Sequence, residues 1–272
     1  MSLKKCALYL RWPTQYGHVY QDCLAPLYSI DVIFPEFDSV LVPMTPRMQA
    51  VIDFFGLRLS SKLKFVYSED QSLSPIPALD ESGVTLNRPN KHGRFPSKNI
   101  SNEDQIHVLK KEFQRLRPIV NTPKQYLIFC SRNNTTLLID NRRRMIQENE
   151  DEIVAYLKEY ANEHNLEFHL LTGQEPDGSE TSLAKQYELF TNAKIAIGPH
   201  GAAFANLIHL DPAKKAKVIE FSNNIGHWTN FKTLLREAPA RFCEYHKIQY
   251  TANHQGADLP HIDIMQIKSL LE

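Results

Sequence analysis

The chain has 272 residues, 42% of them hydrophobic, which is enough for one large or two small domains with their own cores. Its 31 Lys and Arg residues balance 31 Asp and Glu residues, so a partner that depends on excess positive charge, such as a nucleic acid, is disfavoured. The composition favours a neutral enzyme that acts on small molecules.

In the first half of the chain, segments with strand and helix patterns alternate. Gly56 is a typical left-handed helix end, and Ser101 with Asp104 forms a predicted capping box before a further helix. This alternation is typical of a parallel sheet flanked by helices. In chain order, the expected elements are a strand at 6–10, a helix at 15–33, a strand at 39–42, a helix at 47–55, a strand at 63–67 and a helix after Ser101.

Residues 71–100 interrupt this alternation, because they are rich in proline and lack periodicity. We expect a long loop there, either solvated or acting as a lid over a site. Pro118 ends the following helix and Pro123 lies in a short connection. We therefore predict two domains, 1–120 and 121–272.

The second half alternates more regularly. Asn149 followed by Glu152 predicts a capped helix start with an acidic first turn. Four consecutive strand–helix units predict a doubly wound parallel sheet, and the last helix could pack on this domain or back on the N-terminal one. The expected strands are 126–130, 166–171, 194–197, 217–221 and 241–245, and the expected helices are the one after Asn149, 183–190, 226–236 and 262–271.

The stretch 194–210 contains a buried strand, a sharp turn from Gly198 to Gly201, and a run of small and apolar residues suited to a helix. A strand, a glycine-containing turn and a helix start direct backbone N–H groups at one point, where an anion such as a phosphate can bind. His200 in the turn and Asn206 in the helix are polar residues in apolar surroundings, which favours a ligand site.

Polar residues also follow the other strands of the second half. Ligands of parallel sheets bind beyond the carboxyl ends of the strands, so these residues form a candidate site for a nucleotide diphosphate. A cation and N–H groups would bind phosphate, and a carboxylate would bind ribose hydroxyls. Taken singly, each residue could equally cap a loop. The candidates are Ser131, Arg132, Thr172, Gly173, His200, Gly201 and Glu220.

Two further groups are open to two interpretations. The basic run 142–144 is either a solvated surface or a partner for the diphosphate. His18 and Asp22 lie four residues apart on one face of the first helix, where they either share proton transfer or form an exposed pair.

The four cysteines lack the spacing of a zinc site, which favours buried free thiols, although two disulfides remain an alternative. No apolar run reaches the roughly 20 residues of a membrane span, and no signal peptide is apparent. We expect a cytoplasmic protein, unless a leader or anchor has been removed. The sequence contains no Asp-x-Asp motif, which argues against diphosphate binding through a metal held by that motif.

Together these motifs resemble glycosyltransferase family 61, which includes protein O-linked N-acetylglucosaminyltransferases, plant xylosyltransferases and bacterial capsular polysaccharide enzymes. The His-Gly-Ala element followed by Asn206 is the most specific part. The segments that carry the resemblance are 16–24, Ser131 with Arg132, 143–148, 197–202 with Asn206, and 218–220.

The resemblance implies a GT-B architecture, in which two Rossmann-like domains face a cleft. It implies an inverting, metal-independent transfer from a nucleotide sugar, most often UDP-linked, to a glycan or glycolipid acceptor, with no cofactor and with peripheral membrane association at the inner face left open. The N-terminal domain would bind the acceptor and the C-terminal domain the nucleotide sugar. A binding protein of the same fold and a nucleotide-sugar hydrolase remain as alternatives.

Carried onto this chain, the resemblance makes Asp22 the base that deprotonates the acceptor, with His18 beside it, and places His200 near the sugar or the departing phosphate. The expected donor contacts are Ser131, Arg132, Arg143, Arg144, Thr172, Gly173, Gly201, Ala202, Asn206 and Glu220.

Overall fold

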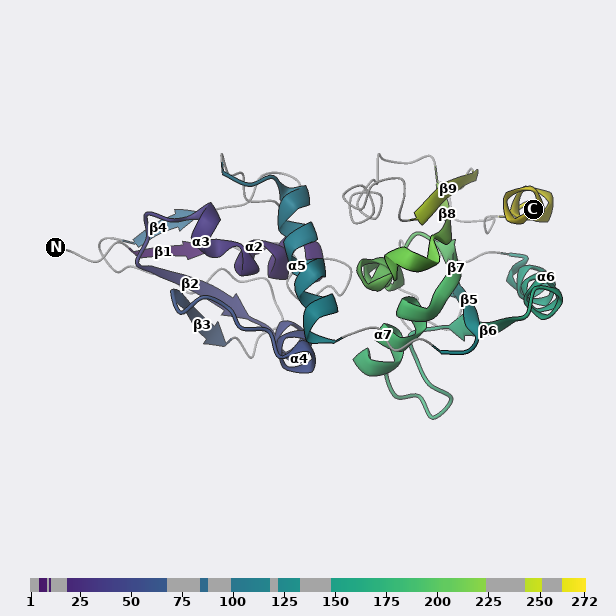
Figure 1. Cartoon of the computed structure of the whole chain (residues 1–272), viewed down its shortest axis with the longest axis horizontal. Coiled ribbons are helices and arrows are strands. Elements are labelled where there is room, and N and C mark those ends of the chain that lie inside the picture. Colours follow the sequence, from purple (N-terminus) through teal and green to yellow (C-terminus); the bar gives the residue numbers. More distant parts are fainter. Residues whose placement is uncertain are drawn as a thin grey trace. The chain divides into compact units, whose positions relative to one another are not determined.

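The computed structural model describes residues 5–8, 10, 19–67, 84–87, 99–117, 122–132, 148–223, 243–250 and 261–272. The chain divides into two compact units, Met1–Pro118 and Ile119–Glu272 (Figure 1). Among the described residues, every pair of neighbouring strands in the two sheets is parallel. The predicted α/β class with parallel sheets is therefore confirmed.

The sheet of the first unit has the strand order β3-β2-β1-β4. Strand β2 continues through Pro43, where 39–42 was predicted, and Pro43 stays in register with Val66 of β3. Strand β4 lies inside 71–100, where only a loop was predicted, because its four residues are too few to show periodicity. The strands are β1 (Lys5–Leu8), β2 (Ser39–Met44), β3 (Leu63–Tyr67) and β4 (Val84–Asn87).

The helix predicted at 15–33 is divided into shorter pieces where the structure describes it. Pro26 lies in the first turn of α2, where its missing N–H is tolerated, whereas in a helix interior it would remove a hydrogen bond. The pieces are the π-helix η1 (Val19–Leu24), α2 (Ala25–Tyr28) and α3 (Ile30–Ile33).

Two longer helices complete the first unit, α4 (Pro46–Phe55) and α5 (Asn102–Leu116). Gly56 ends α4 in the left-handed conformation with φ 66°, and both hydrogen bonds of the capping box at Ser101 are present, so both predictions are confirmed. The ring of Phe113 in α5 stacks on Phe55 with centroids 4.0 Å apart. This contact joins the two helices in the core.

The sheet of the second unit has the order β6-β5-β7-β8-β9. Strands β5 and β7 are neighbours although β6 lies between them in sequence, so the winding direction reverses between them. The last strand was predicted at 241–245 and is longer. The strands are β5 (Gln125–Cys130), β6 (Leu166–Leu171), β7 (Ala193–Pro199), β8 (Ala216–Asn223) and β9 (Cys243–Tyr250).

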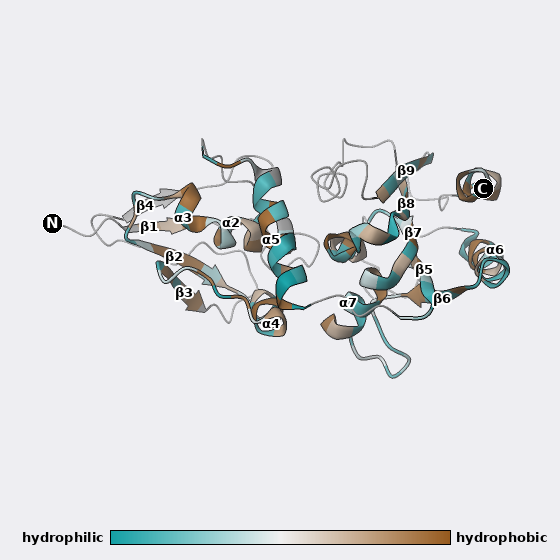
Figure 2. Cartoon of the chain, viewed as in Figure 1, coloured by the Kyte–Doolittle hydropathy of each residue, from teal (hydrophilic) through white to brown (hydrophobic). Residues whose placement is uncertain are grey.

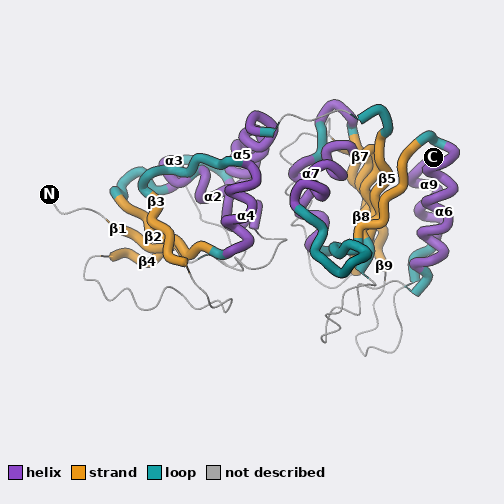
Figure 3. Tube along the Cα trace, turned by 90° about the horizontal axis from the view of Figure 1, so that it is seen from below, coloured by secondary structure: helices purple, strands orange, loops and turns teal. Residues whose placement is uncertain are grey.

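Helices cover both faces of this sheet, with α7 on one face and α6 and α9 on the other (Figure 3). Figure 2 shows hydrophobic and hydrophilic residues side by side on α6, as expected of a helix with one buried face. The helices are α6 (Glu150–Glu163), α7 (Leu183–Asn192), the 3₁₀ helices η3 (Ala202–His209) and η4 (Pro212–Lys214), and α9 (Ile264–Leu271). The predicted helix 226–236 lies outside the described residues.

Helix α9 packs on the second unit, because Ile267 and Leu271 lie in its core with Leu127 of β5. Asn149 occupies the N-cap position of α6, but the predicted cap hydrogen bond is absent from that side chain. The Asn149 amide instead donates to the carbonyl of Ile262 at 2.8 Å and accepts from its N–H at 3.1 Å, which fastens the segment before α9 to α6.

All four cysteines are buried thiols outside any disulfide, as predicted, and the disulfide alternative is wrong. Within the described segments, no helix combines the length and the apolar character needed to cross a lipid bilayer.

Candidate functional site

The carboxyl ends of β5 and β7 bring together four of the predicted site residues. Ser131 and Arg132 follow β5, while His200 and Gly201 follow β7. The Arg132 guanidinium donates from Nη1 to the carbonyl oxygen of His200 at 2.8 Å. Since these two strands flank the reversal in strand order, the residues lie where open parallel sheets bind ligands.

Two glycines permit this close approach. Gly198 has φ +151°, and a Cβ there would lie 2.5 Å from the Cys130 carbonyl oxygen, so a side chain would collide with the end of β5. At Gly201 a Cβ would lie 3.0 Å from Nη1 of Arg132. The absence of a side chain at both positions lets the loop after β7 lie against the residues that end β5.

A buried carboxylate links the turn to β9. His200 Nδ1 contacts one oxygen of Glu220, and the Tyr245 hydroxyl donates to the other. Glu220 on β8 is only 1% exposed. The contact of Nδ1 with Glu220 fixes the orientation of the His200 ring.

Tyr245 was missed because the sequence placed it at the end of a short strand. In β9 it pairs with Val218, two residues from Glu220 on the same face of β8, a diagonal that a tyrosine side chain can span. Burial, followed by the charge of Glu220, raises the pKa of Tyr245 far above its usual value. The hydroxyl therefore keeps its proton. A buried carboxylate needs a hydrogen-bond donor for each oxygen. A search for a second donor to Glu220 could therefore have found Tyr245.

A second buried carboxyl group lies beside Ser131. The Ser131 hydroxyl donates to Oε1 of Glu150 at 2.5 Å, and the Ser131 N–H donates to the Leu171 carbonyl at 2.9 Å. Burial raises the pKa of Glu150. As an acid in the first turn of a helix, Glu150 has an ordinary explanation in the helix dipole, so sequence reasoning did not select it.

Two predicted donor contacts are buried within the second unit. Both oxygens of Glu220 are already hydrogen bonded, so the carboxylate is not open to ribose hydroxyls. Asn206 is 0% exposed, and its amide donates to Gln186 Oε1 at 2.8 Å and to the Ala203 carbonyl at 3.1 Å. It therefore holds η3 against α7.

The remaining predicted donor residues lie on loops. Thr172 and Gly173 follow β6, where the Thr172 hydroxyl donates to the Gln174 carbonyl at 2.8 Å and Gly173 adopts φ 82°. The Thr172 side chain thus caps the loop, which is the alternative that the sequence left open for each of these residues. Ala202 is the exposed first residue of η3. Arg143 and Arg144 lie outside the described residues.

In the first unit, Asp22 lies in the π-helix η1, after the carboxyl end of β1. It is 4% exposed, which contradicts the alternative of an exposed pair as far as Asp22 is concerned. Single π-helical turns often occur at functional sites. His18 lies outside the described residues.

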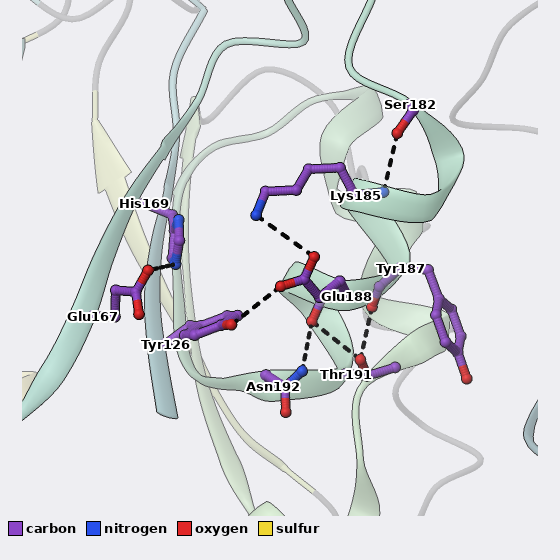
Figure 4. Close-up of polar contacts among 9 residues, drawn as sticks. All are labelled: Tyr126, Glu167, His169, Ser182, Lys185, Tyr187, Glu188, Thr191 and Asn192. Carbon is purple, nitrogen blue, oxygen red and sulfur yellow. Dashed lines mark hydrogen bonds and ion pairs between the residues drawn. The ribbon is translucent and has the colours of Figure 1, made fainter. Parts of the chain in front are cut away.

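A separate polar cluster surrounds Glu188 of α7 (Figure 4). The Tyr126 hydroxyl donates to its carboxylate at 3.2 Å, and Lys185 Nζ lies 3.6 Å from the same group. Tyr126 is near the amino end of β5, whereas Ser131 follows the carboxyl end. The cluster joins α7 to the sheet away from the candidate site.

Comparison with known proteins identifies the family. The glycosyltransferase 61 family model matches residues 16–219, more than half of the chain. The chain belongs to the glycosyltransferase 61 family. The range matched by this family contains Asp22, Arg132 and His200, whereas Glu220 and Tyr245 lie beyond its end.

No curated protein matches this family member significantly. Among solved structures, it is similar to a dodecameric iron-containing heptosyltransferase, TibC, in complex with ADP-D-beta-D-heptose, with 10% identity and a TM-score of 0.40. The alignment covers 91% of this chain and 64% of that protein. Structural likeness this weak carries no argument about the family member described here.

Proposed function

We propose that this chain transfers a sugar from a nucleotide sugar, UDP-linked in the first instance, to a hydroxyl group of a glycan or glycolipid. The transfer inverts the anomeric carbon and needs no divalent metal. The observation that carries the proposal is the meeting of Arg132 and the His200 turn at the strand-order reversal of the second unit. Membership of a glycosyltransferase family supports the reaction class.

In this proposal the second unit binds the donor. Arg132 and the backbone of the Gly201 turn bind the diphosphate. A guanidinium has five N–H donors, so its hydrogen bond to the His200 carbonyl positions the group without exhausting its capacity for phosphate. A planar donor of this kind suits two phosphate oxygens at once.

His200 acts on the departing phosphate. Glu220 holds the ring through Nδ1, and the proposed contact with the departing phosphate is made from the Nε2 edge. Glu220 and Tyr245 are positioning residues that act through His200. This replaces the ribose contact that the sequence assigned to Glu220.

Asp22 of the first unit is the proposed base. Its carboxylate accepts the proton of the acceptor hydroxyl while the new C–O bond forms at the anomeric carbon. The bond from that carbon to the phosphate breaks with its electron pair, and the departing nucleoside diphosphate carries the charge. A single displacement of this kind needs one base and one stabilised leaving group.

The described residues contain no group of three or more His, Cys, Asp or Glu side chains able to hold a metal ion. Metal independence nevertheless stays a prediction, and rates measured with EDTA and with added Mg²⁺ or Mn²⁺ test it directly. A rate that requires one of these ions would contradict it.

The reaction itself is tested with a panel of nucleotide sugars, each incubated with and without simple glycoside and glycolipid acceptors. We expect a glycoside product and nucleoside diphosphate release that depends on the acceptor, with inverted configuration by NMR. Equal release without an acceptor would identify a hydrolase. Tight nucleotide binding with no turnover of any donor would identify a binding protein.

A further inference from the structure

The contact between Ser131 and Glu150 places an acid at the point where the proposed function places a diphosphate. Ser131 is the residue before Arg132, and its hydroxyl lies 2.5 Å from Glu150 Oε1. Glu150 is 7% exposed, and its second oxygen, Oε2, has no hydrogen-bond partner among the described residues. An ionised carboxylate here would be poorly solvated and would repel a phosphate.

The hydrogen-bond chemistry of the pair depends on the charge of the acid. If Glu150 is ionised, it can only accept, so Ser131 must donate its single hydroxyl hydrogen to it. If Glu150 is protonated, the acid can donate to Ser131 Oγ, and the Ser131 hydrogen is then available for another acceptor. A phosphate oxygen is such an acceptor.

Resting on the proposed function, we propose that Ser131 and Glu150 form a proton-linked phosphate contact, in which Glu150 is protonated when the donor diphosphate binds. Ser131 then donates to a phosphate oxygen, and the carboxyl group is neutral beside the anion. Burial, which raises the pKa of Glu150, supports this assignment because it brings proton uptake closer to neutral pH.

Besides burial, two neighbours act on the pKa of Glu150 in opposite directions. The hydrogen bond from the Ser131 hydroxyl lowers it, whereas the charge of Asp151 on α6 raises it. On the segment before α9, His261 lies 3.6 Å from Glu148, so that histidine is paired with a different acid.

The inference is tested by calorimetry of UDP binding to the full chain, at several pH values and in two buffers with different heats of ionisation. The buffer dependence of the heat counts the protons taken up. Above the pKa of Glu150, we expect uptake by the wild-type chain to exceed that by Glu150→Gln by up to one proton. UDP has its own titrating phosphate, and comparison with the variant removes its contribution.

Glutamine has nearly the shape of a protonated glutamate and is neutral at every pH, so Glu150→Gln has a distinctive expected effect. Glu150→Gln should bind UDP more tightly than wild type at high pH, by about tenfold per pH unit above the pKa of Glu150, and equally at low pH. Structural damage cannot produce this gain. The matched control is Glu152→Gln, which removes an exposed carboxylate from the same helix turn and should leave proton uptake unchanged.

Ser131→Ala is the second variant to be tested, because it removes the hydroxyl that lies between the Glu150 carboxyl group and the phosphate in this proposal. We expect weaker UDP binding by about tenfold, as for loss of one charge-assisted hydrogen bond. Equal proton uptake by wild type and Glu150→Gln, with UDP bound by both, would overturn the inference and leave the proposed function intact. Absence of binding by UDP, GDP, ADP and CMP alike would overturn both.

Discussion

The side chain of Arg132 lies directly against the backbone of Gly201. A Cβ at position 201 would be 3.0 Å from Nη1 and 3.3 Å from both Cδ and Cζ of Arg132. The φ of Gly201 is −177°, an extended conformation that any residue adopts. The glycine is therefore needed for space and not for backbone freedom.

Gly201→Ala should displace the Arg132 guanidinium and weaken UDP binding by about tenfold, with the melting temperature unchanged because no backbone strain is added. Calorimetry measures the affinity. In an Arg132→Ala background the same change should have no further effect, since interacting residues are not additive. If the losses of UDP affinity from the two substitutions add up, Gly201 does not act through Arg132.

Asp22→Asn should lower the transfer rate by about 10²- to 10⁴-fold, the usual contribution of a positioned base, while UDP affinity is unchanged. Asparagine has nearly the same shape but cannot accept the proton. Asp31→Asn is the matched control, because Asp31 is an exposed acid of the same unit, 3.3 Å from Lys62. Normal turnover by Asp22→Asn would remove this residue from the mechanism.

Tyr245→Phe should reduce kcat and leave the KM for the donor unchanged, because Tyr245 acts only through Glu220 and His200. The lost hydroxyl leaves one oxygen of a buried carboxylate without its donor, which costs about 1–3 kcal/mol of unfolding free energy. Tyr126→Phe removes a hydroxyl that also donates to a glutamate, Glu188, but at the other end of the sheet. If both variants lower kcat equally, the effect is one of general stability.

Asn206→Leu tests whether the buried amide is structural or binds the donor. Its hydrogen bonds to Gln186 and Ala203 predict a loss of about 1–3 kcal/mol in the free energy of unfolding, since Gln186 would lose its buried partner. Urea unfolding measures this loss. UDP affinity at a temperature where the variant is folded should stay close to wild type. A large loss of affinity in the folded variant would restore Asn206 to the donor site.

Glu150→Gln should also change the dependence of stability on pH in the absence of any ligand. Since the pKa of Glu150 is raised in the folded chain, the folded state holds its proton more tightly than the unfolded state. The resulting stabilisation is complete below the unfolded value of about 4.3 and is lost as pH rises through the folded-state pKa. Urea unfolding from about pH 5 to 8 should therefore show the variant gaining stability over wild type as pH rises. A constant difference would contradict this.

Strands β3 and β6 have the bounds that the sequence predicts, because a continuous strand pattern between clear breaks leaves one interpretation. The site residues that follow β5 and β7 were also predictable, since parallel topology gathers the carboxyl ends of neighbouring strands at one edge. His200 and Arg132 meet for this reason.

Partners that depend on tertiary packing were not predictable. Glu150 and Tyr245 contact residues 19 and 25 positions away, and each has an ordinary local explanation, one as an acid at a helix start and the other as a strand aromatic. Glu220 and Asn206 are buried because other elements of the fold pack over them. Hydrophobic periodicity in the sequence does not show which polar residues will be covered in this way.

The packing of α9 in the core of the second unit has a consequence for synthesis on the ribosome. All residues of the first unit precede those of the second, so the first can collapse while the second is still being translated. The core of the second unit is complete only once α9 has been translated, because Ile267 and Leu271 of α9 lie in it. Deleting α9 should therefore expose an apolar face on the nascent second unit and make that unit the target of chaperones.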